Sequence, residues 1–444
     1  MRARRSGKCT AARTSTLGTL GAVGILALAA CGPTQHSDNA EPTPHTSVQI
    51  ADAPARLPVP HGKGSKTADD FNGDGHRDLV LNDLVKSQAH ADDPGIGIVY
   101  GGERGLTPGA RQLLSPQRQA APTKGQLPAV FDAEATCDLN GDGFTDLVIS
   151  TDPPYDGQGQ PPVPLQLLFG SPNGLTGKAV KLTIPAAARA GNDWPDQPVC
   201  GDFDGDGAQD LVVHASDVQL SFLQGPFTRK GKPKAAAAPI PAPGNAPTGP
   251  AADVDRDGYD DLVVRTAQGT GKSAVVLGGP AGPTRTGVVL PAGIDVALGA
   301  FGKGKGALDA AIGTMDGTSL RYDLPATAAR GTLAVPGSVL DAADFDGDGL
   351  SELVSSGSQL RVFRGRTTGI AAAGMVTVQP PAQGTTRVVA VGDYDGDGRA
   401  DLVVRTFAGE TKDTVAVYPG TAREEGLVAA KPSVRFSSSE FLAR

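Results

Sequence analysis

Aspartates that recur in six short segments are the residues of this chain best suited to chemistry. Each segment reads Asp, any residue, Asp or Asn, any residue, Asp, Gly, any two residues, then a closing Asp or Glu followed by Leu. Positions 1, 3, 5 and 9 are Asp70, Asn72, Asp74 and Asp78; Asp138, Asn140, Asp142 and Asp146; Asp202, Asp204, Asp206 and Asp210; Asp253, Asp255, Asp257 and Asp261; Asp344, Asp346, Asp348 and Glu352; and Asp393, Asp395, Asp397 and Asp401.

This spacing predicts a calcium site in each loop. Ca²⁺ takes six to eight oxygens at about 2.3–2.6 Å, whereas Mg²⁺ prefers a smaller octahedron and keeps its waters. Carboxylates at positions 1, 3 and 5 converge, Gly at position 6 allows the chain to reverse, and the acid at position 9 completes the cage. A single copy would equally suit a hydrated Asp-Gly turn. Six copies with the same closing acid favour a cofactor role for calcium, at up to six sites.

The EF-hand begins with a similar loop but requires Glu at position 12 and flanking helices. Here position 12 is Leu81, Ile149, Val213, Val264, Ser355 or Val404. Runs such as Leu79-Val80-Leu81 follow the loops and are typical of buried strands. The loops are therefore expected to connect strands.

A second pattern lies downstream of the loops, where a strand-like run ends in a glycine turn. Examples are Ile98-Val99-Tyr100-Gly101, Leu167-Leu168-Phe169-Gly170 and Val275-Val276-Leu277-Gly278. Each unit then contains an inner strand, the loop, a buried strand, a hairpin to a third strand and an outer strand. Four antiparallel strands in this order make one blade of a β-propeller.

The spacing of the loops indicates a seventh unit. The fourth and fifth loops begin at Asp253 and Asp344, about two units apart, and Phe301–Ala310 lies between them. This segment retains the turn glycines and the closing Asp309 but has Lys303 and Lys305 at ligand positions. We expect an all-β, seven-bladed propeller of four-stranded antiparallel blades, whose fifth blade binds no metal.

These motifs resemble the FG-GAP repeats of the integrin α-subunit propeller and the related VCBS repeats of secreted bacterial proteins. The resemblance covers nearly all of the chain after residue 60. It implies a seven-bladed propeller with calcium in the loop between the first two strands of a blade, held by the residues named above. Asn72, Asn140, Glu352 and the lysine-bearing fifth unit depart from the family pattern.

The N-terminus has the features of a secretion signal. A basic segment precedes the apolar run Leu17–Ala30, and Leu28-Ala29-Ala30-Cys31 resembles the lipobox of bacterial lipoproteins. We expect a signal peptide over residues 1–30, lipidation of Cys31, a flexible Pro/Ser/Thr-rich tether over 31–60 and the propeller over 61–444. The alternative is an ordinary signal peptide with an incidental cysteine. The expected location is the outer face of the cell membrane, reached through the lipid anchor alone.

Charge and cysteine content limit the choice of function. The leader holds five of the forty basic residues and none of the forty-eight acidic ones, which leaves the remainder strongly acidic. Nucleic acid needs a basic surface and is excluded as a partner. Cys137 and Cys200 each lie just before a metal loop. In an oxidising compartment they are expected either to form a disulfide between the second and third blades or to remain two buried thiols.

Motifs for catalysis are lacking in the sequence. Gly271-Lys272-Ser273 has no preceding glycine or following helix pattern of a phosphate-binding loop, and no Gly-x-Ser-x-Gly motif occurs. We therefore expect a monomeric binding or adhesion scaffold for an extracellular protein or glycan, and not an enzyme. The alternative is a secreted polysaccharide lyase or hydrolase on the same fold, which would need a cluster of His, Tyr, Arg or unpaired acids on one face.

Overall fold

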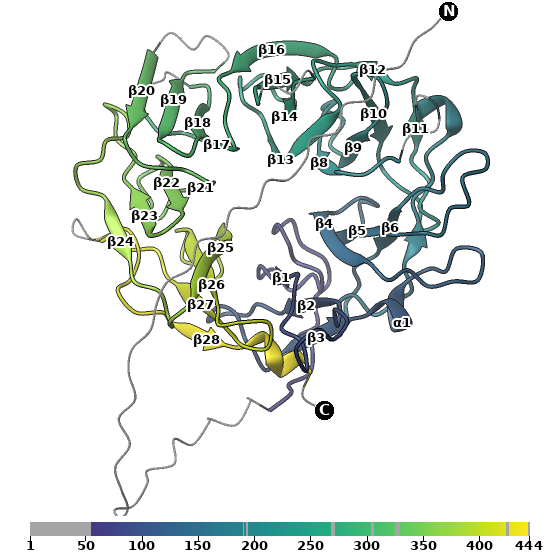
Figure 1. Cartoon of the computed structure of the whole chain (residues 1–444), viewed down its shortest axis with the longest axis horizontal. Coiled ribbons are helices and arrows are strands. Elements are labelled where there is room, and N and C mark those ends of the chain that lie inside the picture. Colours follow the sequence, from purple (N-terminus) through teal and green to yellow (C-terminus); the bar gives the residue numbers. More distant parts are fainter. Residues whose placement is uncertain are drawn as a thin grey trace, which may run out of the picture. The chain divides into compact units, whose positions relative to one another are not determined.

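The computed structural model describes residues 55–442 except 190, 192–193, 268–270, 303–305, 325–328 and 423–425. In this part of the chain, seven β-sheets follow one another around a ring (Figure 1). Helical structure there is limited to α1 (Pro116–Gln119) and the 3-10 turns η1 (Ala186–Ala188) and η2 (Ser438–Phe441). No helix among the described residues is long and apolar enough to cross a membrane.

Each sheet is one blade, and we number the blades in chain order. Blade 1 contains β1 (Leu79–Leu81), β2 (Ile96–Val99) and β3 (Arg111–Leu114). Blade 2 contains β4 (Phe131–Cys137), β5 (Asp146–Thr151), β6 (Leu165–Leu168) and β7 (Val180–Lys181). Blade 3 contains β8 (Val199–Gly201), β9 (Asp210–His214), β10 (Gln219–Gln224), β11 (Ala235–Ala236) and β12 (Ile240–Pro241).

The remaining four blades each have four strands. Blade 4 contains β13 (Ala246–Ala252), β14 (Asp261–Arg265), β15 (Ser273–Leu277) and β16 (Arg285–Leu290). Blade 5 contains β17 (Asp295–Gly299), β18 (Asp309–Gly313), β19 (Thr318–Tyr322) and β20 (Ala329–Leu333). Blade 6 contains β21 (Val339–Ala343), β22 (Glu352–Ser356), β23 (Leu360–Phe363) and β24 (Val376–Val378). Blade 7 contains β25 (Thr385–Gly392), β26 (Asp401–Phe407), β27 (Asp413–Tyr418) and β28 (Val434–Phe436).

The predicted seven-bladed propeller is confirmed, and so is the seventh unit between Asp253 and Asp344, which forms blade 5. Strands pair antiparallel in sequence order, as in β4-β5-β6-β7. Two blades depart from the regular plan. The outer strand of blade 3 is divided into β11 and β12, and blade 1 has three strands among the described residues.

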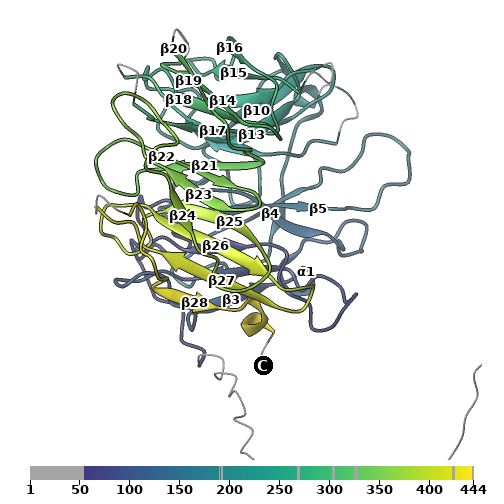
Figure 2. The same cartoon turned by 60° about the vertical axis from the view of Figure 1, so that its left-hand side comes forward.

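The hydrophobic core consists of side-chain clusters between neighbouring blades. Figure 2 shows how the sheets of these blades lie one against the next. The strand after each loop is apolar on both faces because both faces are covered; Leu211, Val212 and Val213 of β9 have no solvent-exposed surface. The apolar residue at loop position 2 also enters this core. Phe203, for example, packs edge-to-face on Phe222 of the same blade, with ring centroids 6.5 Å apart.

No described residue supplies an inner strand to blade 1, because residues 60–67 follow another path. Residues 60–67, which we call the strap, run across the first and second metal loops. Gly62 N–H donates to Asn72 O at 3.1 Å, and Ser65 N–H donates to Gly143 O at 2.7 Å. A Cβ on Gly62 would lie 1.8 Å from the carbonyl carbon of Gly73, so only glycine fits there. Before position 61, Leu57 N–H donates to Gly109 O at 2.9 Å, so this part of the chain also contacts blade 1. Cys31 and the predicted signal peptide lie outside the described residues.

Candidate metal centres

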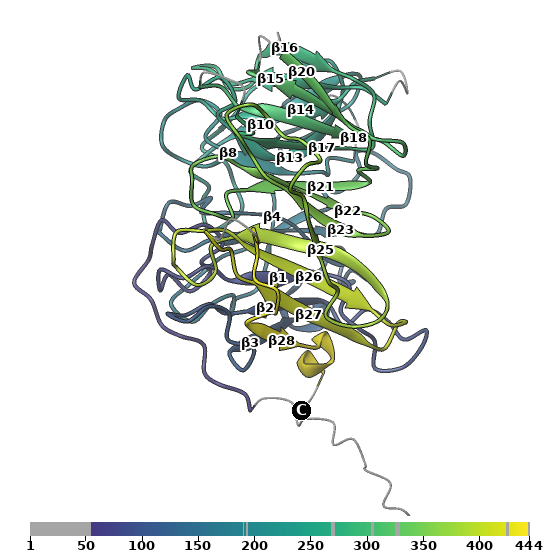
Figure 3. The ribbon, with the colours of Figure 1, turned by 90° about the vertical axis from the view of Figure 1, so that its left-hand side faces the viewer.

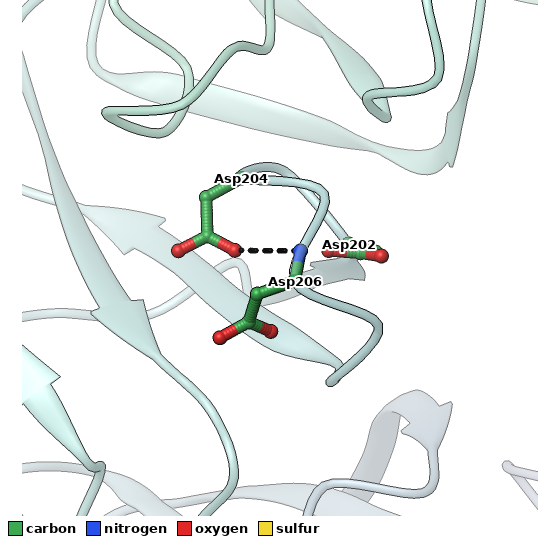
Figure 4. Close-up of side chains that lie close together, drawn as sticks. All are labelled: Asp202, Asp204 and Asp206. Atoms are coloured by element: carbon green, nitrogen blue, oxygen red, sulfur yellow. Dashed lines mark hydrogen bonds between the residues drawn. The ribbon is translucent and has the colours of Figure 1, made fainter.

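Five of the six aspartate segments form tight loops between two strands, as predicted, whereas the first segment precedes β1 and follows no strand among the described residues. Glycine at position 6 has a positive φ in every loop, from 82° at Gly398 to 91° at Gly258. Position 4 also has a positive φ and is glycine in five loops, but it is Arg256, with φ 61°, in the fourth. These left-handed residues turn the chain so that the side chains at positions 1, 3 and 5 lie close together around the loop, as drawn for Asp202, Asp204 and Asp206 in Figure 4.

The aspartate at position 1 organises its own loop. Asp138 Oδ1 accepts N–H bonds from Gly141 (2.8 Å) and Asp142 (3.1 Å), and its Oδ2 accepts one from Gly143 (2.7 Å). Asp70 and Asp393 receive the same three bonds. A carboxylate at this position therefore both shapes the backbone and faces the centre of the loop.

The closing acid links the loop to the glycine turn downstream. Asp78 accepts N–H bonds from Phe71 (2.9 Å), at loop position 2, and from Gly101 (2.8 Å), in the glycine turn after β2. The same two bonds join Asp146 to Leu139 and Gly170, Asp210 to Phe203 and Gly225, Asp261 to Val254 and Gly278, Glu352 to Phe345 and Gly365, and Asp401 to Tyr394 and Gly420. The two sequence signatures are thus parts of one structural unit.

Four loops bring three carboxylates close enough to share a cation, with ligand oxygens within 4.8 Å of one another. The groups are Asp202, Asp204 and Asp206; Asp253, Asp255 and Asp261; Asp344, Asp346 and Asp348; and Asp393, Asp395 and Asp401. The first and second loops have Asn72 and Asn140 at position 3 and so offer an amide in place of one carboxylate.

Unsatisfied oxygens inside the loops fit a cation. Asn72 Oδ1, Asp202 Oδ1 and Asp255 Oδ1 are buried and have no hydrogen-bond partner. A buried oxygen without a donor costs about 1–3 kcal/mol, so such atoms are usually paired. These atoms lie in the first, third and fourth loops, and a positive ion at the centre of each of these loops would pair its unsatisfied oxygen.

The electrostatics of the closing acids point the same way. Burial raises the pKa of Asp78 and Asp146 to about 8, that of Asp210, Glu352 and Asp401 to about 7, and that of Asp261 to about 6. Backbone N–H bonds oppose this increase, and the other loop carboxylates add to it. Burial therefore disfavours the ionised form of these acids unless a nearby positive charge stabilises it.

Basic side chains pair with carboxylates of five of the six loops, four of them from outside the loop and Arg399 from within its own loop, which the sequence analysis did not anticipate. Lys234 pairs with Asp206 at 2.8 Å and Arg285 with Asp257 at 3.1 Å. Three further pairs are Arg229 with Asp142, Arg364 with Asp346 and Arg399 with Asp397. Lys234, Arg229 and Arg285 are far in sequence from the loops with which they pair, so only the fold reveals these ion pairs.

The loop of blade 5 retains the closing acid and lacks the other carboxylates. Asp309 Oδ2 accepts N–H bonds from Phe301 (2.8 Å) and Gly302 (3.0 Å), and its Oδ1 accepts one from Asp323 (2.7 Å). Asp309 thus ties the loop to the downstream turn without any neighbouring ligand set. Lys303 and Lys305 lie outside the described residues.

The structure joins Cys137 of β4 to Cys200 of β8 by a disulfide. Both cysteines lie on inner strands, immediately before the second and third metal loops. The bond therefore connects blades 2 and 3 beside the two loops.

Comparison with known proteins agrees with this architecture. A model of the FG-GAP-like repeat matches residues 138–213 and 344–404. These two segments contain the second, third, fifth and sixth aspartate loops and all or part of the strand that follows each of them. The chain is thus a β-propeller with FG-GAP-like repeats. No curated protein matches its sequence significantly.

Several solved structures are similar to the chain. BBS1N, solved in complex with ARL6DN, is 14% identical over 83% of this chain and 96% of that one, with a TM-score of 0.45. Rhamnogalacturonan lyase YesW is 16% identical over 87% and 76%, with a TM-score of 0.42. The periplasmic gluconolactonase PpgL of Pseudomonas aeruginosa is 12% identical over 81% and 96%, with a TM-score of 0.42. Likenesses at this level say nothing about what this chain binds.

Proposed function

We propose that this protein is an extracellular, calcium-loaded binding scaffold that holds a protein or glycan partner and catalyses no reaction. In this proposal Ca²⁺ is held by positions 1, 3, 5 and 9 of the six aspartate loops. It is a structural cofactor that lets the clustered carboxylates remain ionised.

The proposal rests on oxygen atoms inside the loops that are buried and have no hydrogen-bond partner. Asn72, Asp202 and Asp255 each have a buried, unpaired oxygen, and burial raises the pKa of every closing acid. Oxygen-only ligand sets of this kind suit hard cations, and several carboxylates in a flexible loop favour Ca²⁺ over Mg²⁺.

The proposed location is the outer face of the cell membrane, with lipid attached at Cys31. The Cys137–Cys200 disulfide supports an oxidising compartment, because disulfides persist mainly outside the cytosol. A Cys31→Ser variant should lose both the lipid mass and membrane association. Recovery of this variant with the membrane fraction at wild-type levels would contradict the proposed anchor.

Thermal unfolding with and without calcium tests the metal role. EDTA should lower the melting temperature markedly, and Ca²⁺ should restore it at concentrations where Mg²⁺ does not. The Asp202→Asn/Asp204→Asn variant should bind one calcium fewer in a titration, whereas Asp316→Asn, on an exposed hairpin of blade 5, should bind the full number. An unchanged melt in EDTA would contradict the calcium scaffold.

A further inference from the structure

A groove of about 810 Å³ lies where the strap passes the second and third metal loops. One wall consists of Lys63 to Asp69, which are strap residues and the two residues that follow the strap. Thr136, Asp138 and Asp142 of blade 2 form the second, and Gly207–Gln209 of the third loop complete it. The groove exists because the residues before blade 1 cross the loops instead of forming an inner strand.

The acidic groups of the groove are already engaged. Asp69 pairs with Arg77 at 2.6 Å and accepts a hydrogen bond from Thr136. Asp142 pairs with Arg229, and Asp138 accepts three N–H bonds within its own loop. None of these carboxylates pairs with a lysine of the groove.

The basic groups of the groove are free. Lys63 and Lys66 are exposed, and neither makes an ion pair with any residue in the described part of the chain. The backbone holds them in place, since Lys63 N–H donates to Gly73 O at 3.0 Å and Thr67 N–H donates to Ser65 Oγ at 3.0 Å. Two fixed positions on one wall thus present ammonium groups to solvent.

We propose that this groove binds a linear acidic polysaccharide, with Lys63 and Lys66 contacting its carboxylates. The groove would be the binding site of the proposed scaffold, and it rests on the proposed function in one respect. A cation in the second loop would neutralise the negative charges of Asp138 and Asp142 and leave the groove with a net positive charge. Anionic ligands gain from such a field in proportion to their charge.

The lining favours a charged glycan over an acidic peptide. Peptides derive much of their affinity from side chains inserted into apolar pockets. The residues that line this groove include no Val, Leu, Ile, Met, Phe, Tyr or Trp, so no large apolar side chain forms a socket there. A ligand that carries a charge on successive units and needs no apolar anchor therefore suits the groove better.

Calorimetric titration of the full-length protein with oligogalacturonate, in calcium and at low salt, tests the proposal. The wild type should bind, and the Lys63→Ala/Lys66→Ala variant should bind at least tenfold more weakly. The matched control Lys272→Ala/Lys431→Ala removes two exposed lysines from hairpins of blades 4 and 7 and should bind as the wild type does. Rising salt should weaken binding by the wild type.

Three results would overturn the groove. They are no binding of oligogalacturonate by the wild type, equal binding by the Lys63→Ala/Lys66→Ala variant, or binding of poly-glutamate as tight as that of oligogalacturonate. A calcium-induced rise in melting temperature, measured on the same samples, separates the two proposals. If the rise persists without glycan binding, the groove proposal fails and the calcium scaffold stands.

Discussion

Arg405 of β26 and Asp413 of β27 form a buried ion pair, with 2.6 Å between Nε and Oδ2 and side chains that are 4% and 0% exposed. The guanidinium also reaches into blade 1, where Nη1 donates to Asn82 O at 2.7 Å and Nη2 to Asp83 O at 2.8 Å. Asp413 Oδ1 accepts a bond from Ser438 N–H, at the start of η2. Among the described residues blades 7 and 1 share no strand, so this network closes the ring together with the apolar cluster between the two blades.

Replacing Arg405 with methionine should destabilise the protein by about 3–5 kcal/mol, because it leaves the Asp413 carboxylate buried and unpaired. Urea unfolding in calcium measures the loss. Arg387→Met is the matched control, since Arg387 is exposed on the adjacent strand β25 and should change stability by less than about 0.5 kcal/mol. Similar losses in the two variants would contradict a role for the ion pair in closure.

Asp309→Asn should destabilise the protein by about 2–3 kcal/mol, and by the same amount in calcium and in EDTA. Both carboxylate oxygens of Asp309 accept hydrogen bonds from backbone N–H groups. In the Asp309→Asn variant the side-chain NH₂ group would replace one of these oxygens and would face an N–H donor that it cannot accept a bond from. Asp210→Asn, in the third metal loop, should instead cost more in calcium than in EDTA. A calcium-dependent effect of Asp309→Asn would show that blade 5 also binds metal.

Removing the disulfide with the Cys137→Ser/Cys200→Ser variant should cost about 4 kcal/mol by the chain-entropy estimate for the 63-residue separation. The wild type in strong reductant should unfold at the same urea concentration as the variant, and reductant should not affect the variant. Equal stability of the oxidised wild type and the variant would argue against the bond.

Asp341 of β21 should make stability fall as pH rises. Burial, with the charge of Asp295 on β17, raises the pKa of Asp341 to about 7, so the folded state holds a proton that the unfolded state releases near pH 4. This contribution is present below about pH 4 and is lost as pH rises through about 7. At pH 8, the Asp341→Asn variant should therefore be more stable than the wild type by about 1–3 kcal/mol, and at pH 5 this difference in stability should be smaller. Urea unfolding at both pH values, with Asp316→Asn as the control, checks this; a difference that does not change with pH would contradict it.

The repeated motifs predicted most of the fold and the candidate site because each unit carries its own structure. Loop carboxylates, glycine turns and apolar strands are local signals, and Asp309 marked blade 5 even without its ligands. The sequence Asp-Leu-Val-Val-Arg-Thr occurs at both 261–266 and 401–406, and its arginine has the same structural role in both places. Arg265 donates to the carbonyls of Gly293 and Ile294 before blade 5, as Arg405 does to those of Asn82 and Asp83 in blade 1.

What the sequence did not reveal depends on contacts between distant residues. The strap has the Gly-, Pro- and Ser-containing composition of a linker, and only its bonds to Gly73 and Gly143 show that it covers two loops. The pairing of Arg229 with Asp142 spans 87 residues. No local pattern encodes such a pair, because its geometry arises from the packing of one blade against the next.

The two ends of the described chain meet at blade 1, near the C-terminal label in Figure 3. Leu57 N–H donates to Gly109 O at 2.9 Å, and Arg111 Nε donates to Glu440 O at 3.1 Å, so residues 57 and 440 both bond to the start of β3. Within the part of the chain that the structure describes, no strand crosses from the last blade to the first. A short linker could therefore join these ends, and a circularly permuted chain opened between any two other blades would retain every sheet intact.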